Sequence, residues 1–215
     1  MTQTKKLKRQ YNSTRRQAQA SETRKQIIEA ARKLFAQYGY AGATIEAIAH
    51  EAGVAPETVF AVFGNKRTIL ANLISVAVGG DDQPVPLLQR PGPQSVLQVS
   101  DPARQLQLFA LSISEILERV APVFEIMRTA AKTEPEIAEL SKNILEQRQH
   151  NLAIFVQRLS AHSLLRQGLD DAQATEIVWT IASPEVYNLL TVDRGWSTER
   201  FAQWLGDTLT RLLLP

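Results

Sequence analysis

Residues 44–66 decide the fold of this chain, and they read TIEAIAHEAGVAPETVFAVFGNK. Thr44 can cap a helix through its hydroxyl, and Gly53 supplies the positive φ that a tight turn needs. Pro56 suits the first position of a second helix, which Gly64 then ends. Two short helices joined by such a turn form a helix-turn-helix, whose second helix enters the major groove of DNA.

The helix ends of this stretch predict contacts with phosphate. Thr44 begins a helix whose free amides can hold an anion. Asn65 caps a further helix, predicted over residues 66–78, and Lys66 stands in its first turn. A cation there costs about 0.3–1 kcal/mol, which an arriving phosphate would offset. The alternative is that Lys66 is an ordinary solvated lysine.

The second short helix carries the candidate base contacts. Glu57 can accept a hydrogen bond from a cytosine amine, and Thr58 can bond a base or touch a thymine methyl. Glu57 can equally be a first-turn acid that suits the helix dipole. The apolar side of this helix is predicted to dock it on the domain through Val59, Val62 and Phe63.

Charge is distributed unevenly along the chain. Residues 1–67 hold 12 lysines and arginines against 5 acids, a net charge of +7, whereas residues 68–215 hold 12 against 17, a net charge of −5. The basic first third of the chain indicates a region that binds a polyanion such as DNA. The alternative is a charged tail without a partner.

Residues 1–20 lack apolar periodicity and are expected to form a mobile arm. The first helix is expected from about Thr23 to Gly39, with one apolar face made by Ile27, Ala31, Leu34, Phe35 and Tyr38. The basic side chains expected to reach the DNA backbone or minor groove are Arg15, Arg16, Arg24 and Lys25. The alternative for the arm is a disordered, solubilising tail.

The rest of the chain also predicts helices, so the fold class is all-α. Residues 79–100 are a proline-containing connection with room for short helical turns, and helical patterns follow from Asp101 onward. Pro122 is expected to bend or restart one of these helices. The predicted domains are a basic arm (1–20), a helix-turn-helix DNA-binding domain (21–66) and a larger helical ligand-binding and dimerisation domain (67–215).

A ligand pocket is expected between the helices of residues 101–182. Its candidate lining residues are Phe109, Ile113, Phe124, Met127, Asn151, Phe155 and Trp179. Arg128 and His150 are candidate polar anchors. The apolar bias predicts a small apolar or aromatic ligand. Each of these aromatic and methionine side chains can instead be plain core.

The last helices carry strong apolar stripes that two copies of the chain could pack together. The candidate dimer-interface residues are Ile177, Ile181, Leu189, Phe201, Trp204, Leu205 and Leu209. A homodimer would place two recognition helices about 34 Å apart on a palindrome. The alternative is that these residues form the core of a single chain.

Composition and missing motifs narrow the function classes. The chain has no cysteine, which excludes a disulfide framework and suits a reducing cytoplasm, and it has no apolar run that would span a membrane. No metal-binding, phosphate-loop or nucleophile-elbow pattern is present; His50-Glu51 lacks a second histidine, and Glu146 with His150 is a single pair. We therefore expect no enzyme activity, no metal and no cofactor.

The run from Arg24 to Leu70 resembles the DNA-binding domain of TetR-type transcriptional regulators. The matching positions are Ile27, Ala30, Ala31, Leu34, Phe35, Gly39, Tyr40, Thr44, Ile48, Ala49, Ala52, Gly53, Val54, Thr58, Phe60, Phe63, Lys66 and Leu70. The resemblance implies a homodimeric repressor or activator with a variable ligand-binding domain. It puts the following residues on DNA: Thr44, Pro56, Glu57, Thr58, Phe60 and Lys66.

Three positions depart from the usual pattern of that family. Phe60 stands where tyrosine is common, Val62 where histidine is common, and Ala55 where a capping serine or threonine is common. The function expected is a ligand-released repressor acting on double-stranded DNA. The alternative is a helical small-molecule-binding or scaffold protein with weakened DNA binding.

Overall fold

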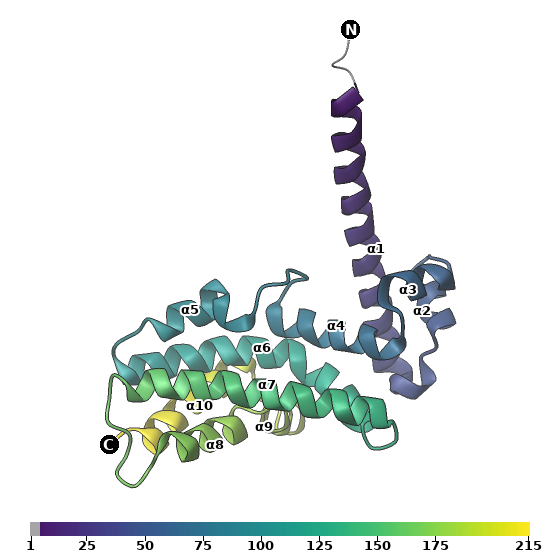
Figure 1. The fold of residues 1–215 in the computed structure, drawn as a ribbon. Coiled ribbons are helices and arrows are strands. Elements are labelled where there is room, and N and C mark those ends of the chain that lie inside the picture. The colour runs from purple at the N-terminus through teal and green to yellow at the C-terminus, as the bar shows by residue number, and fades with distance from the viewer. Residues whose placement is uncertain (1–4) are drawn as a thin grey trace. The chain divides into compact units, whose positions relative to one another are not determined.

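The computed structural model describes the backbone of residues 5–215 and the side chains from residue 15 onward. The helices are α1 (Lys5–Gly42), α2 (Ile45–Glu51), α3 (Pro56–Phe63), α4 (Lys66–Gly79), α5 (Pro91–Leu97), α6 (Pro102–Ala130), α7 (Pro135–Ser160), α8 (Asp171–Ile181), α9 (Pro184–Asn188) and α10 (Thr198–Leu213) (Figure 1). A 3₁₀ turn, η1 (Leu87–Gln89), precedes α5, and a π-helical turn, η2 (Leu189–Asp193), follows α9. The described residues contain no strand, and the predicted all-α class is confirmed.

The chain divides into two compact units. The first ends at Leu73, and the second is Ile74–Pro215. The division falls inside α4, later in the chain than the predicted domain boundary at Lys66.

Helix α1 begins much earlier than the sequence pattern predicts. It is helical from Lys5, so Thr23 lies inside the helix rather than at its start, and the arm expected over residues 1–20 is helical from residue 5. Residues 5–38 contain no proline or glycine and are rich in lysine, arginine, glutamine and alanine, all good helix formers. Residues 5–20 lack the apolar periodicity that predicts a helix start near Thr23. Residues 1–4 of the expected arm lie outside the described residues.

The first unit is held together by the apolar faces of α1, α2 and α3. Its fully buried side chains include Ile27, Ala31, Phe35, Ile48, Ala49 and Val59. Gly39, at φ 70°, ends the regular part of α1 as predicted, and Tyr40 then turns inward onto Phe35, with ring centroids 5.6 Å apart. Tyr38, expected on the apolar face, is instead 57% exposed, because the core-facing stripe of α1 ends at Phe35.

The second unit is built around α6. Helix α6 runs unbroken through Pro122, where the sequence predicted a bend or restart. Helix α10 packs along α6, and a Cβ at Gly206 would meet the end of the Gln107 side chain. The shared core is formed by Leu106, Phe109, Leu117, Leu152, Phe155, Val156, Leu159, Phe201, Leu205 and Leu209.

Candidate nucleic-acid interface and ligand cavity

The turn between α2 and α3 has the geometry that the sequence predicts. Thr44 Oγ1 accepts a hydrogen bond from Ala47 N at 3.1 Å, which caps α2. Gly53 sits at φ 67°, and the next residue closes the turn with a bond from Val54 N to Ala49 O at 3.0 Å. A residue with a Cβ would be strained at that φ, so glycine is required for α3 to leave α2 at this angle.

Helix α3 has one docked face and one exposed face. Val59 is fully buried and Phe63 is 5% exposed, and these two dock the helix on the unit. Glu57, Phe60 and Ala61 are exposed at i, i+3 and i+4 spacing, which places them on a common face. Pro56, Thr58 and Val62 are half-buried between the two faces. Ala55 starts the helix without a side-chain cap, as predicted.

The start of α4 is fixed by two polar side chains. Asn65 Oδ1 accepts from Thr68 N at 2.8 Å, which confirms the predicted cap. Lys66 Nζ donates to Tyr40 O at 2.7 Å and lies 4.3 Å from the centroid of the Tyr40 ring. Lys66 is therefore half-buried and joins α4 to the end of α1. It is not the fully solvated lysine that the alternative described.

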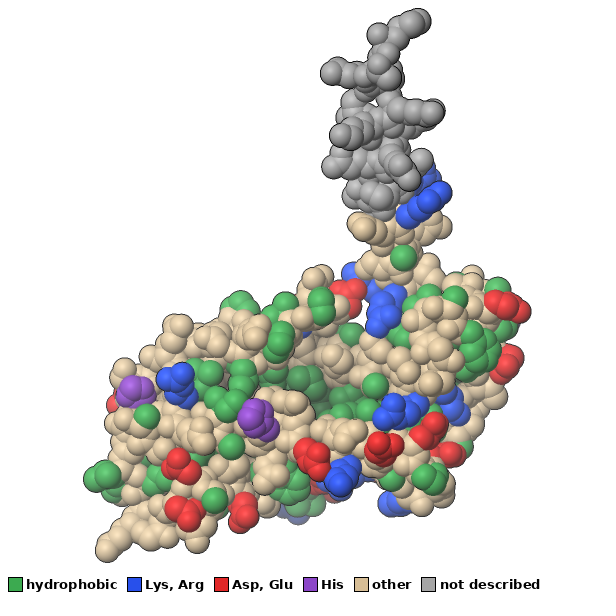
Figure 2. Space-filling model, in the orientation of Figure 1, with side chains coloured by type: hydrophobic (Ala, Val, Ile, Leu, Met, Phe, Trp, Pro, Cys, Tyr) green, Lys and Arg blue, Asp and Glu red, His purple; other side chains and the backbone are tan. Residues whose placement is uncertain are grey.

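The basic residues of α1 divide into two groups. Arg24 donates to Asn72 Oδ1, and its guanidinium carbon lies 4.6 Å from the centroid of the Phe63 ring, so it links α1 to α3 and α4. This role corrects the expectation that Arg24 is free to reach DNA. Arg15, Arg16 and Lys25 are exposed, and Figure 2 shows basic side chains on α1 directly after the residues drawn in grey.

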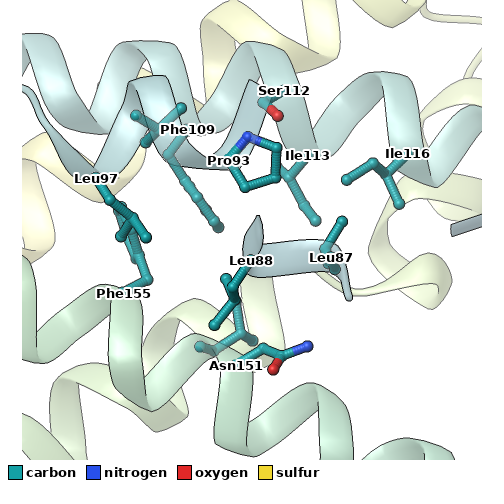
Figure 3. A pocket seen from close by; sticks show the side chains of 12 residues that line it. Leu87, Leu88, Pro93, Leu97, Phe109, Ser112, Ile113, Ile116, Asn151 and Phe155 are labelled. Atoms are coloured by element: carbon teal, nitrogen blue, oxygen red, sulfur yellow. The ribbon is translucent and has the colours of Figure 1, made fainter. Parts of the chain in front are cut away.

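The second unit contains a cavity of about 60 Å³. Side chains from α6, from α7 and from the η1–α5 segment converge on it (Figure 3). Its lining residues are Leu87, Leu88, Pro93, Val96, Leu97, Phe109, Ser112, Ile113, Ile116, Asn151, Leu152 and Phe155. The lining is apolar apart from Ser112 and Asn151, and the rings of Phe109 and Phe155 stack with centroids 4.1 Å apart.

Four of the predicted lining residues reach this cavity: Phe109, Ile113, Asn151 and Phe155. Phe124 and Met127 are core residues elsewhere on α6, at 3% and 0% exposure. Trp179 is not in the lining either, because it packs beneath Arg148. Of the candidate anchors, Arg128 forms an ion pair with Glu185, and His150 is exposed.

Residues 87–97 also line the cavity, which the sequence did not predict. This segment reaches the cavity because Arg90 folds the preceding loop. Its guanidinium makes a two-pronged ion pair with Asp81, at 2.9 and 3.0 Å, and donates to Gln83 O at 3.0 Å and Val85 O at 3.2 Å. The pair with Arg90 lowers the pKa of Asp81 below its usual value. An arginine nine residues after an aspartate is the only sequence signal for this fold-back.

The candidate dimer-interface residues fall into two groups, one fully buried within the chain and one partly or largely exposed. Phe201, Leu205 and Leu209 are fully buried inside the chain's own core, so their side chains cannot form an interface with a second copy. This corrects the prediction for these three and follows from the close packing of α10 on α6. Ile177, Ile181 and Trp204 are half-buried, and Leu189 is 54% exposed.

Among the described residues, no helix is long and apolar enough to cross a membrane. No group of three histidine, aspartate or glutamate side chains in the described part of the chain is arranged to hold a metal ion.

The geometry of α2, the Gly53 turn and α3 defines a helix-turn-helix DNA-binding protein. Residues 27–73 match the family model described as bacterial regulatory proteins, tetR family. The HTH-type transcriptional repressor BepR of Brucella suis biovar 1 (strain 1330) is 30% identical over 145 residues. That match covers 66% of this chain and 66% of BepR, just under two thirds of each.

Solved structures share the fold over most of the chain. NalD, the secondary repressor of the MexAB-OprM multidrug efflux pump in Pseudomonas aeruginosa, has a TM-score of 0.69 at 20% identity, over 91% of this chain and 98% of NalD. FadR from Bacillus subtilis, in complex with stearoyl-CoA, has a TM-score of 0.68 at 21% identity, over 86% of this chain and 96% of FadR. These likenesses show a shared fold, and the family model together with BepR places the chain in the TetR family of transcriptional regulators.

Proposed function

We propose that this regulator is a repressor that binds a palindromic operator as a homodimer and is released by a small apolar ligand. The observation that carries the proposal is the exposed face of α3, which stands between two capped helix N-termini. α2 begins at the Thr44 cap and α4 at the Asn65 cap. Both N-termini can receive a backbone phosphate while α3 enters the major groove.

The proposed contacts are of two kinds: contacts to phosphates, which position the protein on DNA, and contacts to base edges, which recognise the sequence. Thr44 and Lys66 are proposed to contact phosphates, because each stands at a helix N-terminus whose amides attract an anion, and the ammonium of Lys66 adds a positive charge there. Pro56, Glu57 and Thr58 stand at the start of α3, where a recognition helix meets base edges. Phosphate contacts fix register, and the contacts to base edges supply sequence preference.

A homodimer is proposed through the half-buried and exposed apolar residues of α8 to α10: Ile177, Ile181, Leu189 and Trp204. Leu189, on η2, is 54% exposed, so its side chain is accessible to a second copy. Two-fold pairing would set two copies of α3 about one helical turn of DNA apart, which matches a palindrome.

The ligand is proposed to enter the cavity between α6, α7 and the η1–α5 segment. The apolar lining suits an aliphatic or aromatic molecule, with Ser112 and Asn151 as its polar contacts. The fold neighbour FadR was solved with stearoyl-CoA, which supports an apolar chain as one class to screen. Arg119, on α6, donates to Ala77 O on α4 at 3.0 Å, so a shift of α6 on ligand binding would be passed to α4.

The test of the proposed function is titration of the protein with its own upstream DNA at two salt concentrations. The expected result is tight, site-selective binding that weakens steeply with salt. Weak binding that is uniform across sequences would instead favour the alternative, a helical ligand-binding or scaffold protein. A ligand screen for release of the bound DNA then follows.

Lys66→Met is expected to weaken binding to all DNA sequences and to lower the slope of log affinity against log salt by about one. The matched control is Lys142→Met, whose lysine is 75% exposed in the second unit. Since Lys66 also bonds Tyr40 O, thermal unfolding of each variant is measured as well. Thr58→Ala is expected to change sequence preference and leave the slope unchanged. A Lys66 variant with the wild-type salt slope would contradict the phosphate contact.

Leu189→Glu is expected to convert the dimer to a monomer, because a charge on the proposed interface would be buried without a partner. Sedimentation at micromolar concentration measures this. The matched control is Leu164→Glu, whose leucine is 84% exposed in the loop before α8 and which should leave the dimer intact. A wild-type protein that sediments as a monomer would contradict the proposed assembly.

A further inference from the structure

The ring of Phe60 is placed on the surface of α3 without a partner in the fold. It is 49% exposed, although the residues that precede and follow it on the docked face, Val59 and Phe63, are buried. Among the described side chains, no aromatic ring and no cation stacks on Phe60. Figure 2 shows hydrophobic side chains beside acidic ones on the surface over α2 and α3.

The neighbours of Phe60 decide which part of DNA it can meet. Glu57 and Ala61 share its exposed face. A phenylalanine ring has no donor for a phosphate oxygen, and the carboxylate of Glu57 repels phosphate. This face of α3 is therefore unsuited to the DNA backbone and suited to base edges. On those edges in the major groove of unmodified DNA, the one apolar group is the 5-methyl of thymine.

We propose that Phe60 reads a thymine methyl in each half-site, close to a cytosine whose amine Glu57 accepts. Phe60 is thereby a specificity-determining residue of this chain. The inference rests on the proposed DNA binding. Three residues of helix advance about 4.5 Å, against a base step of about 3.4 Å, so the cytosine and the thymine lie within about two steps of each other.

The size of the effect follows from the apolar surface involved. Removing one buried methyl from contact is expected to weaken binding about fourfold. Changing the thymine in both half-sites of a palindrome is expected to weaken it about fifteenfold, since the two contacts are far apart and independent. Phe60→Ala removes the ring that contacts the methyl, so the affinity of this variant for DNA should not depend on the thymine methyl.

The test begins with selection of preferred sites from randomised double-stranded DNA by the full chain. The selected site is then resynthesised with uracil in place of each thymine in turn, which removes only the methyl and keeps the base pair. In each half-site, uracil at one particular thymine is expected to weaken the binding of the wild type about fourfold. Phe60→Ala should bind the thymine and uracil sites equally, and Phe60→Leu should retain part of the difference.

Tyr38→Ala is the matched control, because Tyr38 is an exposed aromatic residue on α1 of the same unit. It should keep the wild-type loss on uracil. Two results would overturn the inference and leave the proposed function standing. One is a wild-type affinity that stays the same whichever thymine is replaced by uracil. The other is a Phe60→Ala variant whose affinity still falls fourfold on the uracil site. If no sequence is enriched, the proposed function fails, and this inference fails with it.

Discussion

Phe201→Ala is expected to lower the free energy of unfolding of the second unit by about 3–5 kcal/mol. The ring is fully buried, with Tyr187 packed edge-on at 5.0 Å between centroids and Trp204 tilted at 5.7 Å. Its removal costs both the apolar transfer energy and a cavity that closely packed α6 and α10 cannot close. Denaturant unfolding followed by circular dichroism measures the loss.

The control for this prediction is Leu164→Ala, on a side chain that is 84% exposed and lies outside the proposed interface, which should cost less than about 1 kcal/mol. Phe201→Ala should also keep the wild-type association state below its unfolding midpoint. A variant that dissociates while its stability is unchanged would show that Phe201 belongs to an interface, as the stripe on α10 first indicated.

Arg148→Met is expected to lower the free energy of unfolding by about 2–3 kcal/mol, because Arg148 donates hydrogen bonds to carbonyls at the end of α8. Its guanidinium donates to Trp179 O at 2.6 Å and to Ala182 O at 3.0 Å, and it lies 5.1 Å from the centroid of the Trp179 indole. The last carbonyls of a helix have no partner within it, and a cation there also suits the dipole. Methionine keeps the apolar stem and leaves both carbonyls without this donor.

Burying the charge of Arg148 opposes the stabilisation that its hydrogen bonds supply. Burial lowers the pKa of Arg148 to about 10, with Glu185 opposing that shift and Arg128 adding to it. Since the folded-state pKa lies below the unfolded one, the cost of the buried charge is fully present below about pH 10 and is relieved only as the pH rises above it. The stability difference between Arg148→Met and wild type should therefore be constant from about pH 6 to 9.

Denaturant midpoints of Arg148→Met measured across that pH range test both statements. The matched control is Arg158→Met, an exposed arginine on the same helix, which should change stability by less than about 0.5 kcal/mol. Equal stability of the two variants would mean that the carbonyls of α8 find other donors.

Local signals made the DNA-binding unit predictable from the sequence. The caps at Thr44 and Asn65 and the turn at Gly53 depend on a few neighbouring residues, and all are found as expected. The start of α1 was not predictable in this way, because the sequence of residues 5–20 has no apolar periodicity, although it is rich in good helix formers. The bond of Lys66 to Tyr40 O was not predictable either, because it joins residues far apart in sequence.

Long-range packing explains the other errors. The stripe of α10 shows that Phe201 and Leu205 are buried, but a stripe does not say whether the covering surface belongs to the same chain or to another. That choice depends on α6, about a hundred residues earlier in the chain. The cavity was expected among helices 101–182, and its α6 and α7 residues were partly identified, whereas residues 87–97 reach it through a loop whose path no periodicity encodes.

The ion pair of Arg90 with Asp81 has a consequence for how the cavity opens. Pro84 and Pro86 offer no amide donors, and the carbonyls of Gln83 and Val85 that precede them bond the same guanidinium that pairs with Asp81. These bonds share a single side chain, so a movement of Arg90 away from the loop removes all of them together. The loop that leads to Leu87 and Leu88 is thus expected to open in one all-or-none step, so that ligand entry on that side would wait on a single cooperative event rather than on gradual loosening.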